Sequence, residues 1–371
     1  MRRIRPDELD ASLPLGCDVL DHTGHRILAM GSVPQAQPAW ARWLAAGLYV
    51  DELLLWQQPP RTARQLIYHA IATLAPVLAN PAACRDFSAE ILAVVDMVQE
   101  AWQRDRDVTT AMVMLCRDGP HAARQAIYTA CVVLRVWRGM GGLEETEAPL
   151  LAAALSLQLD VQAAPRTLSS VLALRQPDLG DLLPRLGVHD QRWLESARQA
   201  DILREGGDPA HRLRERGVSD AAQLIALADL FCFHADHPET RQGGQSRAVL
   251  RDLLISHGEY YDVQIASYFI RAMGLYPLGT VVQLASGEIG VVCDQGEQLD
   301  TPWICSLFTP AGTPLPEPAL RDTSIAGNAI QQSLSAAALP GDVSLVGIWG
   351  EEARDYGMPH ALPVHSLHHS V

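Results

Sequence analysis

The stretch HGEYYDVQIASYFIRAMGLYPLGTVVQLASGEIGVV, residues 257–292, contains the point at which the chain changes from helical to strand character. Up to residue 273 its apolar side chains follow a helical spacing. After GLYPLGT they alternate, and TVVQLASGEIGVVCD has the pattern of two strands joined at Ser286-Gly287. The sequence therefore predicts that a helical domain ends near residue 275 and that a β-rich module follows.

Upstream of this point the pattern is almost entirely helical. Thr62 and Gln65 have the spacing of a capping box that opens the first of these helices. The apolar residues that share one face of this helix are Ile67, Ala70, Ile71, Leu74 and Leu78. Further helices are predicted around residues 121–138, 147–158, 164–175, 189–204, 219–235, 246–256 and 261–273.

The two ends of the chain differ from this helical middle. CDVLDHTGHRILA, residues 17–29, has two short apolar runs around a turn, which predicts a hairpin. A short helix that turns at Gly47 follows, and Pro59-Pro60 marks a boundary. At the other end PWICSLFTP, residues 302–310, is a candidate third strand, and we expect the turn-rich remainder to be loosely ordered.

The sequence thus predicts a mainly α protein in three parts. These are an N-terminal α/β module over residues 1–58, a helical domain over 59–275, and a β-rich module with a tail over 276–371.

Composition restricts the chemistry. The 371 residues carry a formal charge of −14, which disfavours general nucleic-acid binding, and no apolar run is long enough to cross a membrane. The chain contains no lysine, so it cannot form a Schiff base or bind phosphate through a P-loop lysine. Its 7 cysteines are scattered without a Cys-x-x-Cys pair, which predicts buried thiols in a reducing compartment.

The order of the segments resembles bacterial HD-GYP proteins, the metal-dependent cyclic di-GMP phosphodiesterases. The similar features are the hairpin module, the helical domain and a closing strand pair of the form GxYPxGTxVxLxxGExGxV within residues 257–292. LIALADLFCF, residues 224–233, is similar to the stretch that precedes this segment in the family. The resemblance implies an HD-GYP-like helical domain in which bound metals activate a water for attack on a phosphodiester.

The resemblance also implies where metal ligands would stand. The positions of this chain that match them are Gln125, Leu157, Gln158, Gln176, Gln199, Ala200, Asp201 and Asp229. The His-Asp pair that names the family falls on Leu157 and Gln158, and only Asp229 stands where a family ligand stands.

These replacements predict the loss of the metal site. Glutamine is a poor ligand for iron, manganese or zinc, leucine has no donor atom, and two carboxylates cannot replace the missing ligands. We therefore expect no metal, no other cofactor and no catalytic residue. The chain is then expected to be a pseudoenzyme of this family rather than an enzyme. Its expected role is that of a cytoplasmic regulatory or protein-binding module in cyclic di-GMP signalling. Its expected partners are proteins, with cyclic di-GMP as an open possibility, and not nucleic acid.

Two alternatives stay open. A phosphodiesterase with a rebuilt metal site would use Asp201, Asp229 and the pair His234 and His237. A receptor that binds cyclic di-GMP without hydrolysing it would need arginines for the phosphates. The arginines nearest in sequence are Arg175, Arg198 and Arg204.

Several short motifs have ordinary structural interpretations. RDRD, residues 104–107, matches an Arg-x-x-Asp pattern that binds cyclic di-GMP in some diguanylate cyclases, but it is expected to join two helices. GMGG, residues 139–142, is expected to be a turn. CFHADHP, residues 232–238, is expected to be the polar end of a helix rather than a metal cluster. The histidines at 365, 368 and 369 belong to the tail.

Overall fold

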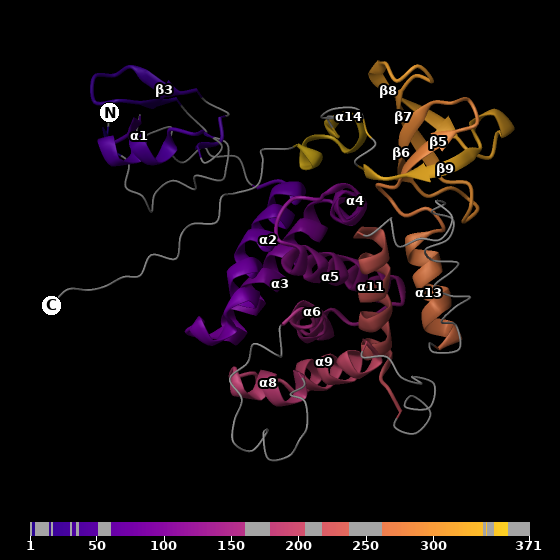
Figure 1. Ribbon diagram of the computed structural model, residues 1–371, viewed down its shortest axis with the longest axis horizontal. Helices are drawn as coiled ribbons and strands as arrows, with labels where there is room; N and C mark the ends of the chain where they lie inside the picture. Colours follow the sequence, from indigo (N-terminus) through magenta and orange to yellow (C-terminus); the bar gives the residue numbers. More distant parts are fainter. Residues whose placement is uncertain are drawn as a thin grey trace.

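The computed structural model of this chain describes residues 2–3, 15, 18–29, 32–34, 37–50, 61–159, 179–204, 217–236, 262–336, 339 and 345–354. Over these residues the fold is mainly helical, with two small antiparallel sheets (Figure 1). None of the described helices is long and apolar enough to cross a membrane. The mainly α class is confirmed, whereas the HD-GYP-like type and the domain boundaries stay predictions.

The N-terminal module is a four-stranded antiparallel sheet with one short helix beside it. Its elements are β1 (Arg2–Arg3), β2 (Val19–Leu20), β3 (Arg26–Leu28), α1 (Trp40–Ala46) and β4 (Tyr49–Val50), and the strand order is β1-β4-β2-β3. In the turn between β2 and β3 the Asp21 carboxylate accepts hydrogen bonds from the backbone N–H groups of Thr23 and His25. Gly47 ends α1 with φ +92°. The predicted hairpin and helix are confirmed.

The helical part is a bundle whose long helices surround α5 (Figure 1). Its helices are α2 (Ala63–Ala79), α3 (Phe87–Arg104), α4 (Arg106–Leu115), α5 (His121–Gly139), α6 (Glu147–Ser156), α8 (Leu179–Arg185), α9 (Gln191–Arg204), α11 (Asp220–Asp236) and α13 (Val263–Met273). Two single turns, η3 (Pro81–Ala83) and η4 (Glu144–Thr146), precede α3 and α6. Because α2, α4, α6, α11 and α13 all contact α5, this helix is buried along most of its length.

Local sequence signals set several of the helix ends. Both bonds of the Thr62–Gln65 capping box are present at the start of α2. Asp105 ends α3 and also caps α4, because its carboxylate accepts from the backbone N–H groups of Asp107 and Val108. RDRD therefore joins two helices, as predicted. GMGG forms the turn after α5, also as predicted, with Gly141 at φ +76°.

The C-terminal module is a five-stranded antiparallel sheet. Its strands are β5 (Val281–Leu284), β6 (Ile289–Asp294), β7 (Trp303–Phe308), β8 (Pro314–Asp322) and β9 (Ile330–Leu334), in the order β8-β7-β6-β5-β9. Gly287 makes the predicted β5–β6 turn with φ +86°. The sheet approaches α4 closely, since a Cβ at Gly279 would lie 2.5 Å from the Ala111 carbonyl oxygen.

The expectation that the chain is loosely ordered after the third strand is wrong for β8 and β9. Strand β8 includes Pro314, Pro316 and Pro318, which argued against a strand. It pairs only with β7 at the edge of the sheet, where a proline need not donate a hydrogen bond to a second neighbour. The tail histidines and the predicted helices at 164–175 and 246–256 lie outside the described residues.

Residues 345–354, here called the return segment, connect the sheet to the helical bundle. The segment contains α14 (Val346–Trp349) and η9 (Glu351–Ala353). Trp349 Nε1 donates to the Cys293 carbonyl oxygen at 3.3 Å. At the start of α2 the Glu352 carboxylate accepts from the Ala63 N–H at 2.7 Å. The return segment therefore has hydrogen bonds to both parts of the fold.

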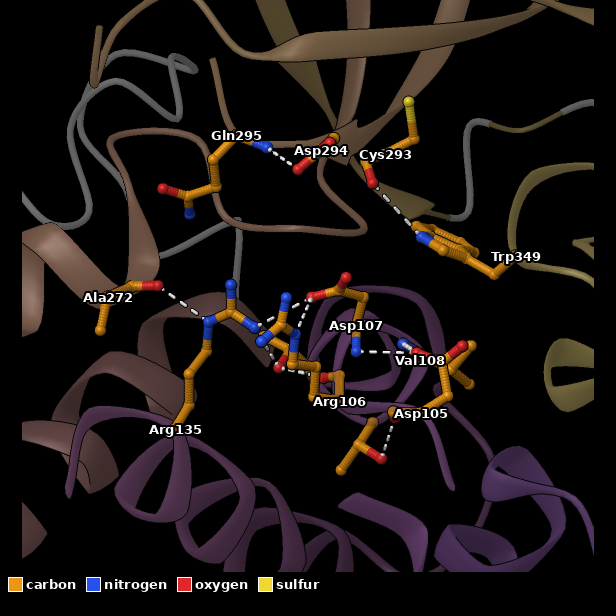
Figure 2. A network of polar contacts seen from close by, with 12 residues as sticks. Asp105, Arg106, Asp107, Val108, Arg135, Ala272, Cys293, Asp294, Gln295 and Trp349 are labelled. Carbon is orange, nitrogen blue, oxygen red and sulfur yellow. Dashed lines mark hydrogen bonds and ion pairs between the residues drawn. The ribbon is translucent and has the colours of Figure 1, made fainter. Parts of the chain in front are cut away.

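A second junction is formed around Arg135 of α5 (Figure 2). Arg135 Nε donates to the Ala272 carbonyl oxygen at 2.8 Å, and Nη1 donates to Thr110 and Asp107 at 3.1 and 3.3 Å. Burial lowers the pKa of Arg135, and the nearby Asp107 carboxylate opposes that shift. The junction joins α4, α5 and the end of α13, and it gives Asp107 a structural partner.

The cysteines only partly follow the prediction of buried thiols. Cys116, Cys131 and Cys232 are buried, and the remaining described cysteines, Cys84, Cys293 and Cys305, are half-buried. Cys17 lies outside the described residues. Two of the half-buried thiols, Cys293 and Cys305, lie on neighbouring strands.

Candidate functional site

Three of the predicted positions, Gln125, Gln158 and Asp229, lie together in the helical bundle. With Thr129 beside them, these residues form what we call the Asp229 cluster. Gln125 Nε2 on α5 donates to the backbone oxygen and to Oδ1 of Asp229 on α11, at 2.8 and 3.0 Å. Gln158 Nε2, just after α6, donates to the same Oδ1 at 2.7 Å. Thr129, one helical turn after Gln125, has its hydroxyl 3.4 Å from that oxygen.

The cluster lies inside the core. Gln125 is 3% exposed, Asp229 is 6% exposed and Thr129 is fully buried. A carboxylate in such a place is costly unless it accepts hydrogen bonds, and the two amides supply them. Asp229 thus has structural partners on α5 and after α6. Thr129 was missed, although its place four residues after Gln125 on the same helix face was a usable signal.

The described residues of the cluster do not fit the metal ions that the resemblance implies. An amide N–H points at Asp229 Oδ1 from two sides, and an N–H group cannot ligate a cation. Over the described part of the chain, no group of three or more His, Cys, Asp and Glu side chains is placed to hold a metal. The cluster can fix the positions of α5, α11 and the end of α6 relative to one another.

The other predicted positions have different surroundings. Leu157 and Ala200 are buried apolar residues of the core. Gln199 Oε1 accepts from the N–H and hydroxyl of Ser219, which precedes α11. Ten residues of α11 separate Ser219 from Asp229, about 15 Å along the helix, so Gln199 is not part of the cluster. Asp201 accepts from the Leu179 N–H at the start of α8.

The remaining candidates are only partly described. Gln176, Arg175 and His237 lie outside the described residues, as does the side chain of Arg204. Arg198 donates two hydrogen bonds to Glu195, three residues before it on α9, and these bonds lower the pKa of Glu195. The imidazole ring of His234 makes an edge contact with Phe233.

A cavity of about 620 Å³, here called the Trp137 cavity, lies where five helical elements meet, and the sequence did not indicate it. Its lining residues are Trp137, Thr146, Leu150, Gln191, Arg192, Glu195, Ser196, Ser219 and Ala221. They come from α5, η4, α6, α9 and the start of α11. The lining combines apolar walls and an indole ring with an arginine, a carboxylate and hydroxyl groups.

The indole of Trp137 is held in place by the loop that follows α5. Its Nε1 donates to the Leu143 carbonyl oxygen at 3.4 Å. A Cβ at Gly142 would lie 2.3 Å from the indole ring, so only glycine fits there without moving it. Arg192, near the start of α9, is exposed and keeps its guanidinium accessible to solvent. The cavity therefore pairs a fixed aromatic ring with an accessible cation.

The chain is similar to the cyclic di-GMP phosphodiesterase PA4108 of Pseudomonas aeruginosa, with 31% identity over 108 residues. The matched segment covers 28% of this chain and 26% of that protein, so the chain spans about a quarter of the length of the relative it matches. No family model and no solved structure matches the chain. The similarity suggests an HD-GYP-like relationship.

This comparison corrects one expectation. The residue types at eight positions predicted that the chain is not an enzyme, but the relative is named as a phosphodiesterase, which contradicts that prediction. One of the eight positions, Gln176, lies outside the described residues. The expectation of an inactive protein is withdrawn, and the assignment of the eight positions to a former metal site stays a prediction.

Proposed function

We propose that this chain acts in cyclic di-GMP signalling and binds cyclic di-GMP in the Trp137 cavity. The observation that carries the proposal is the 108-residue similarity to a cyclic di-GMP phosphodiesterase. The cavity contributes the chemistry that a guanine dinucleotide requires. The protein partner expected from the sequence stays a prediction beside this one.

The size and lining of the cavity support a nucleotide ligand. Its volume of about 620 Å³ lies within the range of small-molecule sites. A purine base can stack on the indole of Trp137, and such stacking contributes about 1–3 kcal/mol per base. The Arg192 guanidinium can donate two parallel hydrogen bonds to a phosphate or to the O6 and N7 atoms of guanine.

The Asp229 cluster has a supporting role in this proposal. It fixes α5, α6 and α11, and these helices also supply Trp137, Leu150 and Ala221 to the cavity. Gln125 and Trp137 are twelve residues apart on α5, about 18 Å along the helix. The cluster therefore positions the walls of the cavity without touching the ligand.

Retention of labelled cyclic di-GMP by the full chain tests the proposal. Arg192→Gln removes the exposed cation, and we expect it to weaken binding about tenfold, the equivalent of about 1.4 kcal/mol. Arg42→Gln removes an exposed arginine of α1 in the N-terminal module and should leave binding unchanged. Following the label into linear products in the same samples measures hydrolysis directly.

Two results would count against the proposal. If the wild-type chain retains no cyclic di-GMP, the function is wrong. If Arg192→Gln binds as well as Arg42→Gln, the Trp137 cavity is not the binding site.

A further inference from the structure

Cys293 and Cys305 lie side by side on neighbouring antiparallel strands of the C-terminal sheet. Val291 of β6 is paired with Cys305 of β7, and the register shifts between Val292 and Asp294. Cys293 is the extra residue in this bulge and follows Val291 by two positions, so its side chain is on the same face as Cys305. The register therefore makes the two cysteines diagonal neighbours on one face of adjacent strands.

The two thiols are chemically unequal. The interaction with Cys305, together with burial, raises the pKa of Cys293. The interaction with Cys293 lowers the pKa of Cys305. Cys293 Sγ also lies 3.5 Å from the Trp303 carbonyl oxygen, a second acceptor for its proton. Cys305 is therefore the thiol that becomes a thiolate first, and both are half-buried and within reach of a small oxidant.

We propose that Cys293 and Cys305 form a redox-active dithiol that hydrogen peroxide converts to an intramolecular disulfide. The Cys305 thiolate attacks one peroxide oxygen, the O–O bond breaks, and hydroxide leaves to give a sulfenic acid. The Cys293 sulfur then attacks the Cys305 sulfur, the S–O bond breaks, and water leaves with the thiol proton. Two thiols and one peroxide become one disulfide and two waters, and a thiol reductant reverses the change.

The position of Cys293 gives this step a structural consequence. The Cys293 carbonyl oxygen accepts the hydrogen bond of Trp349 (Figure 2). Three residues later, Glu352 of the return segment bonds the start of α2. A disulfide draws the bulge toward β7, because its Cα atoms must lie within about 7 Å of each other. Oxidation is therefore expected to loosen the bond to Trp349 and the contact between sheet and bundle.

The sequence makes the cross-link easy to detect. Trypsin cleaves after lysine and arginine, and residues 272–320 contain neither. Cys293 and Cys305 therefore fall in one tryptic peptide, residues 272–321, which contains no other cysteine. In the full-length chain treated with hydrogen peroxide, this peptide should lose two hydrogens. Cleavage after Glu297 separates the cysteines, and the two halves should stay joined until they are reduced.

Two variants and a matched control test the assignment of roles. In Cys293→Ser the Cys305 sulfenic acid has no resolving thiol and should be trapped by a 1,3-dione, whereas Cys305→Ser should give neither product. Cys84 is also half-buried, but burial and Glu90 raise its pKa to about 11, and it should react at least about tenfold more slowly than Cys305.

The cross-link and its structural consequence can each be contradicted by a measurement. Oxidation of Cys305 without a cross-link to Cys293, or oxidation of Cys84 at the same rate as Cys305, would overturn the proposal. Hydrogen exchange of residues 345–354 tests the structural consequence: faster exchange after oxidation supports it, and unchanged exchange beside a complete cross-link refutes it.

Discussion

At the scale of single residues, the notable feature is a carboxylate whose partners are amides. Asp229 Oδ1 accepts from Gln125 and Gln158, and the Oε1 atom of Gln125 is buried without a hydrogen-bond partner in the described structure. The amides neutralise no charge, but they supply hydrogen bonds to the buried Asp229 oxygen. These bonds also link three elements of the bundle. A change of Gln158 to a carboxylate should disturb this arrangement most.

Gln158→Asp is expected to destabilise the chain at neutral pH by about 1–3 kcal/mol, because it replaces an N–H donor with a second negative charge beside Asp229. Gln158→Asn shortens the side chain equally without charge and serves as the control in urea unfolding. Like charges raise the folded-state pKa of the carboxyl pair. The extra loss should therefore be absent below about pH 4 and grow as the pH rises.

The same variant separates a structural cluster from a cation site. Because the wild-type cluster presents amide N–H groups to Asp229, added Mn²⁺ should stabilise the wild-type chain less than it stabilises Gln158→Asp. Equal stabilisation of the two chains by Mn²⁺ would contradict this interpretation of the cluster. An equal unfolding free energy for Gln158→Asp and Gln158→Asn at pH 7 would contradict the account of Asp229 itself.

At the scale of elements, Glu288 connects three strands of the C-terminal sheet. Its carboxylate accepts from Arg321 Nε and Nη2 of β8 at 2.8 and 2.9 Å, and from the Ser306 hydroxyl of β7 at 3.0 Å. The hydrogen bonds from Arg321 hold the pKa of Glu288 below its ordinary value. The pair helps to keep the proline-containing edge strand β8 in place.

Glu288→Gln should remove part of the acid sensitivity of the sheet. A depressed folded-state pKa contributes stability above the unfolded-state value of about 4.3, and this contribution is lost as the pH falls below it. The wild-type chain should thus lose about 1 kcal/mol more than Glu288→Gln between pH 7 and pH 3. Glu317→Gln, an exposed acid on β8, is the control, and equal pH profiles for Glu288→Gln and wild type would refute the prediction.

The return segment permits a comparison of adjacent residues. Glu352 accepts from the Ala63 N–H at the start of α2, where a helix carries partial positive charge, whereas Glu351 pairs locally with Arg354. We expect Glu352→Gln to cost about 1 kcal/mol of unfolding free energy, and Glu351→Gln a few tenths. Chemical denaturation measures both, and a larger loss for Glu351→Gln would contradict the contact.

The sequence predicted elements with strong local signals and missed those set by distant contacts. The Thr62–Gln65 cap, the β2–β3 hairpin and the long helices follow from short-range patterns, and they are present. Strand β8 was missed because its prolines argue against a strand unless it lies at the edge of a sheet, and the sequence does not show that it lies there. The Arg135 junction was missed because its partners Asp107 and Ala272 are 28 and 137 residues away along the chain.

The candidate site divides in the same way. The resemblance to the HD-GYP family indicated Gln125, Gln158 and Asp229 as positions that match metal ligands. The structure brings these three residues together. The Trp137 cavity could not be predicted, because it forms only where the ends of α5, α6, α9 and α11 meet. The sequence indicated Gly142 only as a turn residue, and not that the Trp137 indole leaves no room for a side chain there.

At the scale of the whole molecule, the return segment joins the helical bundle to the β sheet, and the Arg135 junction joins α4, α5 and α13 within the bundle. The Trp137 cavity lies in the bundle, while the Cys293–Cys305 pair lies in the sheet near the return segment. The proposed ligand site and the proposed dithiol therefore lie in separate parts of one connected fold. The central claim is that this fold recognises cyclic di-GMP.

Isothermal titration of the full-length chain with cyclic di-GMP tests this claim most directly. The account predicts saturable binding with a dissociation constant in the micromolar range or tighter, equivalent to about −8 kcal/mol or better. It also predicts that Arg192→Gln weakens this binding about tenfold. Absence of saturable heat with cyclic di-GMP, confirmed by equilibrium dialysis, would contradict the account.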